Sequence, residues 1–150
     1  MNGGYGSGTL TAGYIKLGNL YQEIQHYDAA KHCYLEAISV SSDNPADNAQ
    51  CQHLLAVISS ITGRHQDALK HEQQGYKILK TLLGPDSVPA KQALTWVKKF
   101  TQNVVVSIKM IQGKQEQKIR EKALNDLLTS DVPTKQKKNK KNSRMKKKKK

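Results

Sequence analysis

The sequence is poor in aromatic residues, cysteine and long apolar runs, and each shortage excludes a class of protein. Aromatic side chains make up 5% of the 150 residues and hydrophobic residues 37%, which favours a thin, elongated fold with polar extensions over a thick core. No apolar stretch approaches the roughly twenty residues of a membrane-spanning helix. Two cysteines, Cys33 and Cys51, are too few for a disulfide framework, so we expect free thiols in a reducing, cytoplasmic setting.

The formal net charge of +13 is concentrated at one end of the chain. The last sixteen residues hold eleven basic side chains and no acid, whereas the remainder is nearly neutral. Such a tail attracts phosphates by releasing counterions, and it has no aromatic residues to stack on bases. We therefore expect contact with RNA or ribosomes, a nuclear-import signal, or an inert solvated tail. The basic residues are Lys135, Lys137, Lys138, Lys140, Lys141, Arg144, Lys146, Lys147, Lys148, Lys149 and Lys150.

Apolar residues recur at steps of three and four along most of the chain, which predicts an all-α protein. Small and polar residues between these stretches predict the caps and turns. We expect Tyr27-Asp28 to turn the chain, Ser42 or Asp43 to cap the third helix, and Gly113 to interrupt the last helical region before Pro133 ends it. The expected helices cover residues 12–24, 29–40, 46–61, 66–83 and a stretch from about residue 87 past Met110.

These elements predict four segments along the chain. Residues 1–9 are rich in glycine and are expected to be disordered. Residues 10–112 are expected to form one helical-repeat domain and residues 113–133 a short helical extension. The lysine-rich residues 134–150 are expected to form a disordered tail, because a run of like charges repels itself and buries nothing.

The first four helices form two similar pairs, with corresponding residues 38 positions apart. Small residues recur where two helix backbones would approach, and large residues recur on either side of them, which predicts close packing of antiparallel helices. Neither pair buries its apolar face alone, so the pairs must stack. The packing residues are Tyr14, Leu17, Gly18, Tyr21, Ala30, Tyr34 and Ala37 in the first pair and Leu55, Ala56, Ala68 and Gly75 in the second.

This pattern resembles the tetratricopeptide repeat, although the period is four residues longer than the usual 34. The first pair follows the repeat closely. The second pair departs from it, because Gln52, Ser59 and Glu72 occupy positions where the repeat has aromatic residues. The resemblance implies two repeats and a closing helix in a short α-solenoid.

Two further stretches resemble the C-terminal repeats of the clustered mitochondria protein family. They are "GRHQDALKHEQQGYKILKTLLGPDS" followed by "LTWVKKFTQNVVV", and "KALNDLLTS" before the lysine-rich tail. The resemblance implies a cytosolic, non-enzymatic scaffold linked to mitochondrial distribution, to messenger RNAs for mitochondrial proteins and to translation initiation. Kinesin light chains, whose repeats also carry "LGPD", offer a cargo or complex adaptor as the alternative. A third alternative is a basic RNA-associating protein that acts mainly through its tail.

In a repeat array of this type, the first helix of each pair lines the concave face. A polar face rich in amides suits an extended or helical peptide from a partner protein, and the alternative is a solvated face without a ligand. We do not expect a carboxylate clamp, because Ile15 stands where such clamps carry a lysine. The predicted groove residues are Ile15, Asn19, Gln22, Gln50, His53 and Val57.

The sequence predicts no metal site, cofactor or catalytic centre. The pairs His32-Cys33 and Cys51-x-His53 match no zinc-ligand spacing. Acidic residues are scattered along polar helix faces, and no nucleophile elbow or phosphate loop is present. We therefore expect a protein that acts by binding, with its oligomeric state left open.

Overall fold

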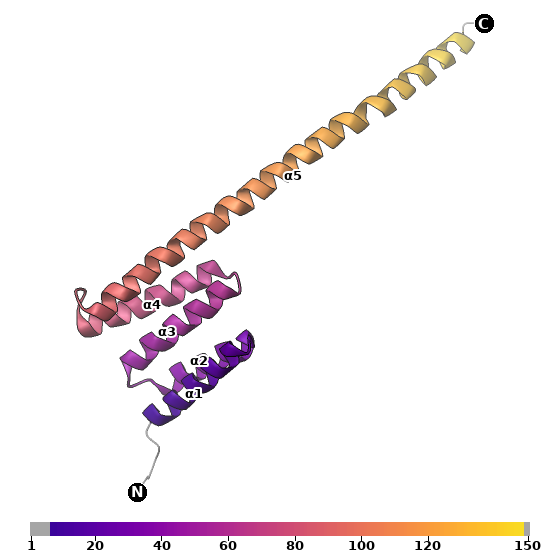
Figure 1. The fold of residues 1–150 in the computed structure, drawn as a ribbon. Helices are drawn as coiled ribbons and strands as arrows, with labels where there is room; N and C mark the ends of the chain where they lie inside the picture. The colour runs from indigo at the N-terminus through magenta and orange to yellow at the C-terminus, as the bar shows by residue number, and fades with distance from the viewer. Residues whose placement is uncertain (1–6, 149–150) are drawn as a thin grey trace. The chain divides into compact units, whose positions relative to one another are not determined.

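A computed structural model describes the backbone of residues 7–148 and the side chains of residues 8–129. The chain divides into two compact units, Met1–Ser107 and Ile108–Lys150. Every regular element among the described residues is an α-helix, which confirms the predicted all-α class. The helices are α1 (Ser7–Glu23), α2 (Tyr27–Val40), α3 (Pro45–Ile61), α4 (His65–Leu83) and α5 (Val88–Lys148), as Figure 1 shows.

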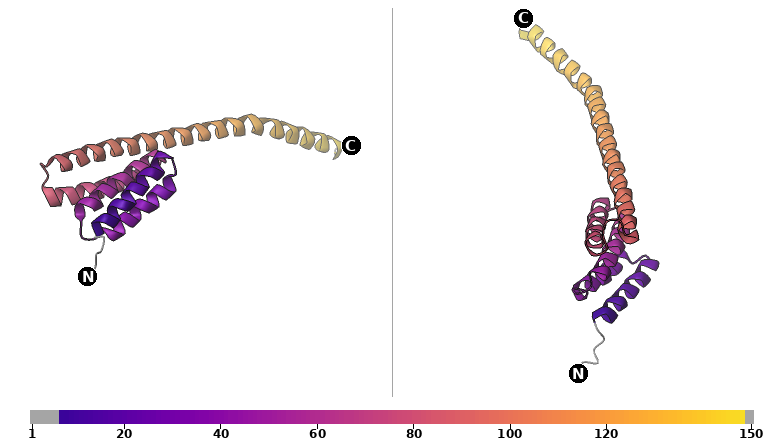
Figure 2. Two further views of the ribbon diagram at one scale, coloured as in Figure 1. Left: turned by 60° about the horizontal axis from the view of Figure 1, so that its bottom comes forward. Right: turned by 90° about the vertical axis from the view of Figure 1, so that its left-hand side faces the viewer.

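Within the first unit, the helices stack in the order of the chain. Helices α1 and α2 form one pair, α3 and α4 form the next, and α2 packs against α3 (Figures 1 and 2). The first turns of α5 then pack on the second pair, because Phe100 of α5 is buried against Ala56 of α3 and Ala68 of α4. Two helix pairs and a closing helix are therefore confirmed.

The first pair is held closely at Gly18. A Cβ atom at this position would lie 2.5 Å from Cε1 and 2.8 Å from Cδ1 of the Tyr34 ring, so only glycine leaves room for the ring. Tyr34 is fully buried, and its hydroxyl donates to Asn19 Oδ1 at 2.7 Å and lies 3.1 Å from Gln22 Oε1. The small residue therefore sets the distance between α1 and α2.

The two pairs meet in two apolar clusters between α2 and α3. In one, Leu55 and Ile58 of α3 lie beside Ala30 and Tyr34 of α2, and all four are at most 1% exposed. The other, nearer α1, joins Ile15, Ala37 and Cys51. Burial of these side chains is what stacks the second repeat on the first.

Most residues that the repeat pattern assigned to packing are buried or half-buried, but Leu17 is an exception. Its side chain is 43% exposed, and the neighbouring Leu20 is 58% exposed. The corresponding residues of the second pair, Leu55 and Ile58, are covered by α2. No described helix covers this face of α1 in the way that α2 covers the corresponding face of α3. The buried or half-buried residues are Tyr14, Gly18, Tyr21, Ala30, Tyr34, Ala37, Leu55, Ala56, Ala68 and Gly75.

The caps differ in part from those predicted. The residue that caps α3 is Asn44, whose Oδ1 accepts from the backbone N–H groups of Ala46 at 3.1 Å and Asp47 at 3.4 Å, so the prediction of Ser42 or Asp43 is wrong. Asn44 directly precedes Pro45, the first residue of the helix, and its side chain can therefore reach the second and third amides. Gly63 and Gly84 follow α3 and α4 with positive φ angles, as helix-ending glycines do.

The predicted limits of the first two helices also need correction. Helix α1 begins at Ser7, so residues 7–9 are helical although their composition predicted disorder. Residues 1–6 lie outside the described part of the chain. Helix α2 already includes Tyr27 and Asp28, and the chain turns at residues 24–26 instead, where Gln25 adopts a φ of +62°.

Helix α5 is longer than the sequence predicts. It passes Gly113 and Pro133 without a break and ends at Lys148, so the predicted interruption and stop are both wrong for the backbone. The compact units divide at residues 107 and 108, earlier than the predicted boundary at 112 and 113. The predicted tail, residues 134–150, begins inside α5, and its disorder remains an expectation from its charge pattern.

The second unit consists of the remainder of α5. All its described side chains, residues 108–129, are exposed, including Ile119, Leu124 and Leu127. Among the described helices, none combines the length and apolar character needed to cross a membrane.

Candidate protein-binding groove

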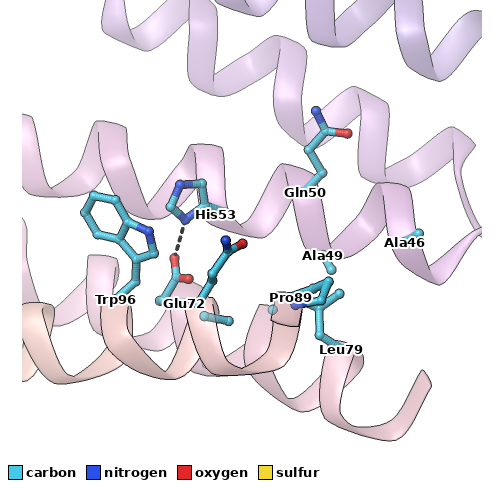
Figure 3. Close-up of a pocket in the computed structure, with 11 residues that line it drawn as sticks. Ala46, Ala49, Gln50, His53, Glu72, Leu79, Pro89 and Trp96 are labelled. Atoms are coloured by element: carbon cyan, nitrogen blue, oxygen red, sulfur yellow. Dashed lines mark hydrogen bonds and ion pairs between the residues drawn. The ribbon is translucent and has the colours of Figure 1, made fainter. Parts of the chain in front are cut away.

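A pocket of about 360 Å³ opens in the first unit where α3, α4 and the first turns of α5 meet. Helix α4 contributes the fewest residues and lies between the other two. Figure 3 shows how the lining side chains are arranged. They are Ala46, Ala49, Gln50 and His53 of α3, Glu72, Gly75 and Leu79 of α4, and Pro89, Gln92, Ala93 and Trp96 of α5.

The helical repeat of each element explains this lining. The lining residues of α3 follow one another at intervals of three, one and three, and those of α5 repeat the same intervals. Residues with this spacing share one face of a helix. A Cβ at Gly75 would lie 3.3 Å from the carbonyl oxygen of Ala49, so the glycine lets α4 approach α3 beneath the pocket.

At one end of the pocket, Glu72, His53 and Trp96 lie side by side, as Figure 3 shows. His53 Nδ1 lies 2.8 Å from Glu72 Oε2, and the Glu72 side chain is 2% exposed. The rings of His53 and Trp96 meet edge to face at 5.2 Å. Trp96 also stacks on the buried ring of Phe100, and Lys99 Nζ lies 4.5 Å from the Trp96 ring centre. The Trp96 side chain is therefore held by packing before any ligand arrives.

Of the six predicted groove residues, the structure brings only Gln50 and His53 to this pocket. Val57 is half-buried and does not line it. Asn19 and Gln22 contact the Tyr34 hydroxyl from α1, so they also support the helix pair. Ile15 is 8% exposed.

The assignment of Ile15 to the groove is wrong. Its side chain packs with Ala37 of α2 and Cys51 of α3. The repeat pattern describes one helix pair by itself, and α3 closes over this part of α1 only when the second pair stacks on the first. A position that faces outward in an isolated pair is therefore buried in the array.

The residues that sequence reasoning missed are Glu72, Gln92 and Trp96. Glu72 did carry a signal, because it stands at a repeat position where an aromatic residue is usual. Trp96 is the only tryptophan of the chain. The predicted tail residues, from Lys135 to Lys150, lie outside the part of the chain whose side chains are described.

Both cysteines are free and buried. Burial raises the pKa of the Cys51 thiol to about 11, with a smaller contribution from Asp47, and it also raises the pKa of Cys33. Burial likewise raises the pKa of Tyr34 to about 12. These groups stay protonated near neutral pH and act as packing residues. Across the described residues, no three histidine, cysteine or acidic side chains are grouped as metal ligands would be.

Comparison with known proteins agrees with this architecture. Residues 12–44 match one family model described as a tetratricopeptide repeat, and residues 48–88 match a second model with the same description. The Clustered mitochondria protein homolog of Homo sapiens is 29% identical over 93 residues. The match covers 59% of this chain and 7% of the human protein. No solved structure matches the chain.

The chain is therefore a tetratricopeptide-repeat protein, a class whose stacked helices serve as a scaffold for binding other proteins. Its repeats resemble those of the clustered mitochondria protein. The matched residues take in most of α1, all of α2 and α4, and α3 from Asn48 onward, and they end at Val88, where α5 begins. Three of the pocket's eleven lining residues belong to α4, four to α3 and four to α5.

Proposed function

We propose that the chain is a non-enzymatic scaffold that holds a segment of a partner protein in the groove between α3 and α5. The observation that carries this proposal is the pocket itself, which combines apolar side chains such as Leu79 and Pro89 with polar ones such as Gln50 and Glu72 and is lined by one face of each helix. Such a combination fits a peptide that contributes an apolar side chain and hydrogen-bonding groups together.

The resemblance to the clustered mitochondria protein supports a finer proposal. We place the chain in the cytoplasm, as part of a scaffold linked to mitochondrial distribution and to messenger RNAs that encode mitochondrial proteins. The match spans 7% of the length of that relative, so the proposed cellular role rests on similarity within the repeats alone.

Site-specific photocrosslinking tests the groove directly. A photoreactive amino acid replaces Gln92, an exposed residue of the groove, or Gln73, an exposed residue of α4 that does not line it. In cells, the Gln92 variant should crosslink to a discrete set of proteins that resists RNase, and the Gln73 variant should not. Equal crosslinking from both positions would show that the groove is not the binding surface.

The charge of the tail favours a second activity, which is contact with RNA or ribosomes. Eleven basic residues would bind phosphates without sequence preference, and the affinity should fall steeply with salt. We expect a chain truncated before Lys135 to lose most of its RNA affinity at about 50 mM salt. If the truncated chain binds RNA as tightly as the full chain, or if salt has no effect, the tail has no part in RNA binding.

A further inference from the structure

The pocket carries one unusual charge, at Glu72. Among the lining side chains, Glu72 is the only acid, and no lysine or arginine lines the pocket. Its side chain is 2% exposed, whereas acidic side chains are almost never fully buried unless they are paired. His53, which also lines the pocket, is charged only when protonated, and beside a neutral His53 the Glu72 carboxylate sets the sign of the electrostatic potential inside the pocket.

The hydrogen bonds of Glu72 are incomplete. Its Oε2 is paired with His53 Nδ1 at 2.8 Å, and no described residue donates to its Oε1. An ionised carboxylate accepts through both oxygens. Among the described residues, His65 Nδ1 is the only fully buried side-chain N or O atom without a partner, so Glu72 Oε1 keeps an exposed area through which a ligand can reach it. A ligand that brings a hydrogen-bond donor into the pocket would supply the hydrogen bond that Glu72 Oε1 lacks.

We infer that the groove selects partner segments in which a basic side chain, arginine above all, lies next to an apolar one. The inference rests on the proposed function and specifies its ligand. The guanidinium donates to Glu72 Oε1, its stem lies along the alanines of α3 and α5, and the apolar neighbour fills the end at Leu79 and Pro89. Arginine is favoured over lysine because its planar group is more weakly hydrated and donates in a fixed fork.

The surroundings of Glu72 agree with a cationic ligand. The Trp96 ring stands at the same end of the pocket, and indole faces attract guanidinium groups. Lys99 already lies over the Trp96 ring, but it is exposed and therefore screened by solvent. A carboxylate ligand would instead meet the buried charge of Glu72. The groove thus discriminates by repulsion as well as by attraction.

The test uses three otherwise identical peptides that are acetylated and amidated. Each carries one leucine and, at a fixed distance from it, arginine, citrulline or glutamate, and the set is made at spacings of one to four residues. Because Trp96 is the only tryptophan, its fluorescence reports binding to the full chain. At the best spacing, the arginine peptide should bind about tenfold more tightly than its citrulline counterpart, and the glutamate peptide should bind more weakly than both.

Glu72→Gln keeps the shape of the side chain and removes its charge. This variant should bind the arginine and citrulline peptides equally, while Glu23→Gln, the same change on the exposed end of α1, should keep the tenfold preference. If Glu72→Gln fails to fold, the affinities of the arginine and citrulline peptides for the unaltered chain still decide whether the groove selects a positive charge.

The outcomes separate this inference from the proposed function. Equal binding of the arginine and citrulline peptides overturns the charge selection and leaves a groove that binds peptides. A preference that survives in Glu72→Gln also overturns it. If no peptide binds, both proposals fail. The lysine-rich tail of the chain is a competing occupant. If truncation before Lys135 changes the Trp96 fluorescence in the absence of peptide, the tail fills the groove and the inference is overturned in its favour.

Discussion

Two glycines of the same helix should respond to the same substitution with opposite signs. Gly18 and Gly13 both lie inside α1. A Cβ at Gly18 would meet the Tyr34 ring at 2.5 Å, whereas a Cβ at Gly13 would have nothing within 4 Å. Replacement of each glycine by alanine therefore compares two effects on stability: the gain in helix propensity alone at Gly13, and the same gain together with a steric clash at Gly18.

The magnitudes follow from these distances. Alanine is about 1 kcal/mol more favourable than glycine inside a helix, so Gly13→Ala should stabilise the chain by up to about 1 kcal/mol. At Gly18, carbon atoms that prefer a separation of about 3.5–4.0 Å would be forced about 1 Å closer. The Tyr34 ring cannot swing away, because it is fully buried and its hydroxyl is held by Asn19 and Gln22. Overpacking of this kind costs about 1–3 kcal/mol, so Gly18→Ala should be destabilising by about 1–2 kcal/mol after the helix gain.

Urea and thermal unfolding of the full chain, followed by circular dichroism and by Trp96 fluorescence, measure both variants. The melting temperatures should move in opposite directions, by roughly 4 °C or more per kcal/mol. In a Tyr34→Leu background the clash is absent, and Gly18→Ala should then become neutral or stabilising. If Gly18→Ala is as stable as the unaltered chain, or if both alanine variants shift the same way, the close approach of α1 and α2 is not as described.

Three further predictions concern buried residues of the helix pairs. Ala30→Leu should lower the free energy of unfolding, measured in urea, by about 1–3 kcal/mol, because Ala30 of α2 is fully buried and a larger side chain overpacks its surroundings. An unchanged urea midpoint would contradict the close packing around Ala30. Burial lowers the pKa of His71, so its contribution to the free energy of unfolding is fully present above about pH 6.5 and should be lost as the pH falls through the lowered pKa. His71→Gln should flatten this part of the curve of stability against pH, and an unchanged curve would refute the lowered pKa of His71. Cys33 and Cys51 should react with a thiol reagent only after denaturant is added, and rapid reaction of the folded chain would contradict their burial.

The helix pairs could be predicted from sequence because their signals are local. Gly18, Ala30 and Ala37 are small where two neighbouring helices must touch, and the apolar periodicity around them needs no distant partner to be recognised. The same local reasoning failed at the helix ends. Asn44 caps α3 although two nearby residues are equally suitable by type, and Gln25 turns the chain without being a glycine.

The groove was less predictable, because burial at a given residue depends on which helix comes to lie against it. Gln50 and His53 follow the repeat register and do line the pocket. Ile15 obeys the same register but is covered by α3. Glu72 and Trp96 could not be brought together from sequence, because they lie on different helices and meet only when α5 packs on the second pair.

By itself, the sequence determined that this chain is a stack of tetratricopeptide-type helix pairs, since the spacing of small and large residues within each pair is sufficient to specify how two adjacent helices pack. Only the tertiary structure decided which side chains a partner could reach. Stacking buried Ile15, left Leu17 exposed, and enclosed the Glu72 carboxylate beside His53 and Trp96. The physical reason is that exposure and electrostatic environment belong to the surface created between repeats, and that surface does not exist in any one repeat alone.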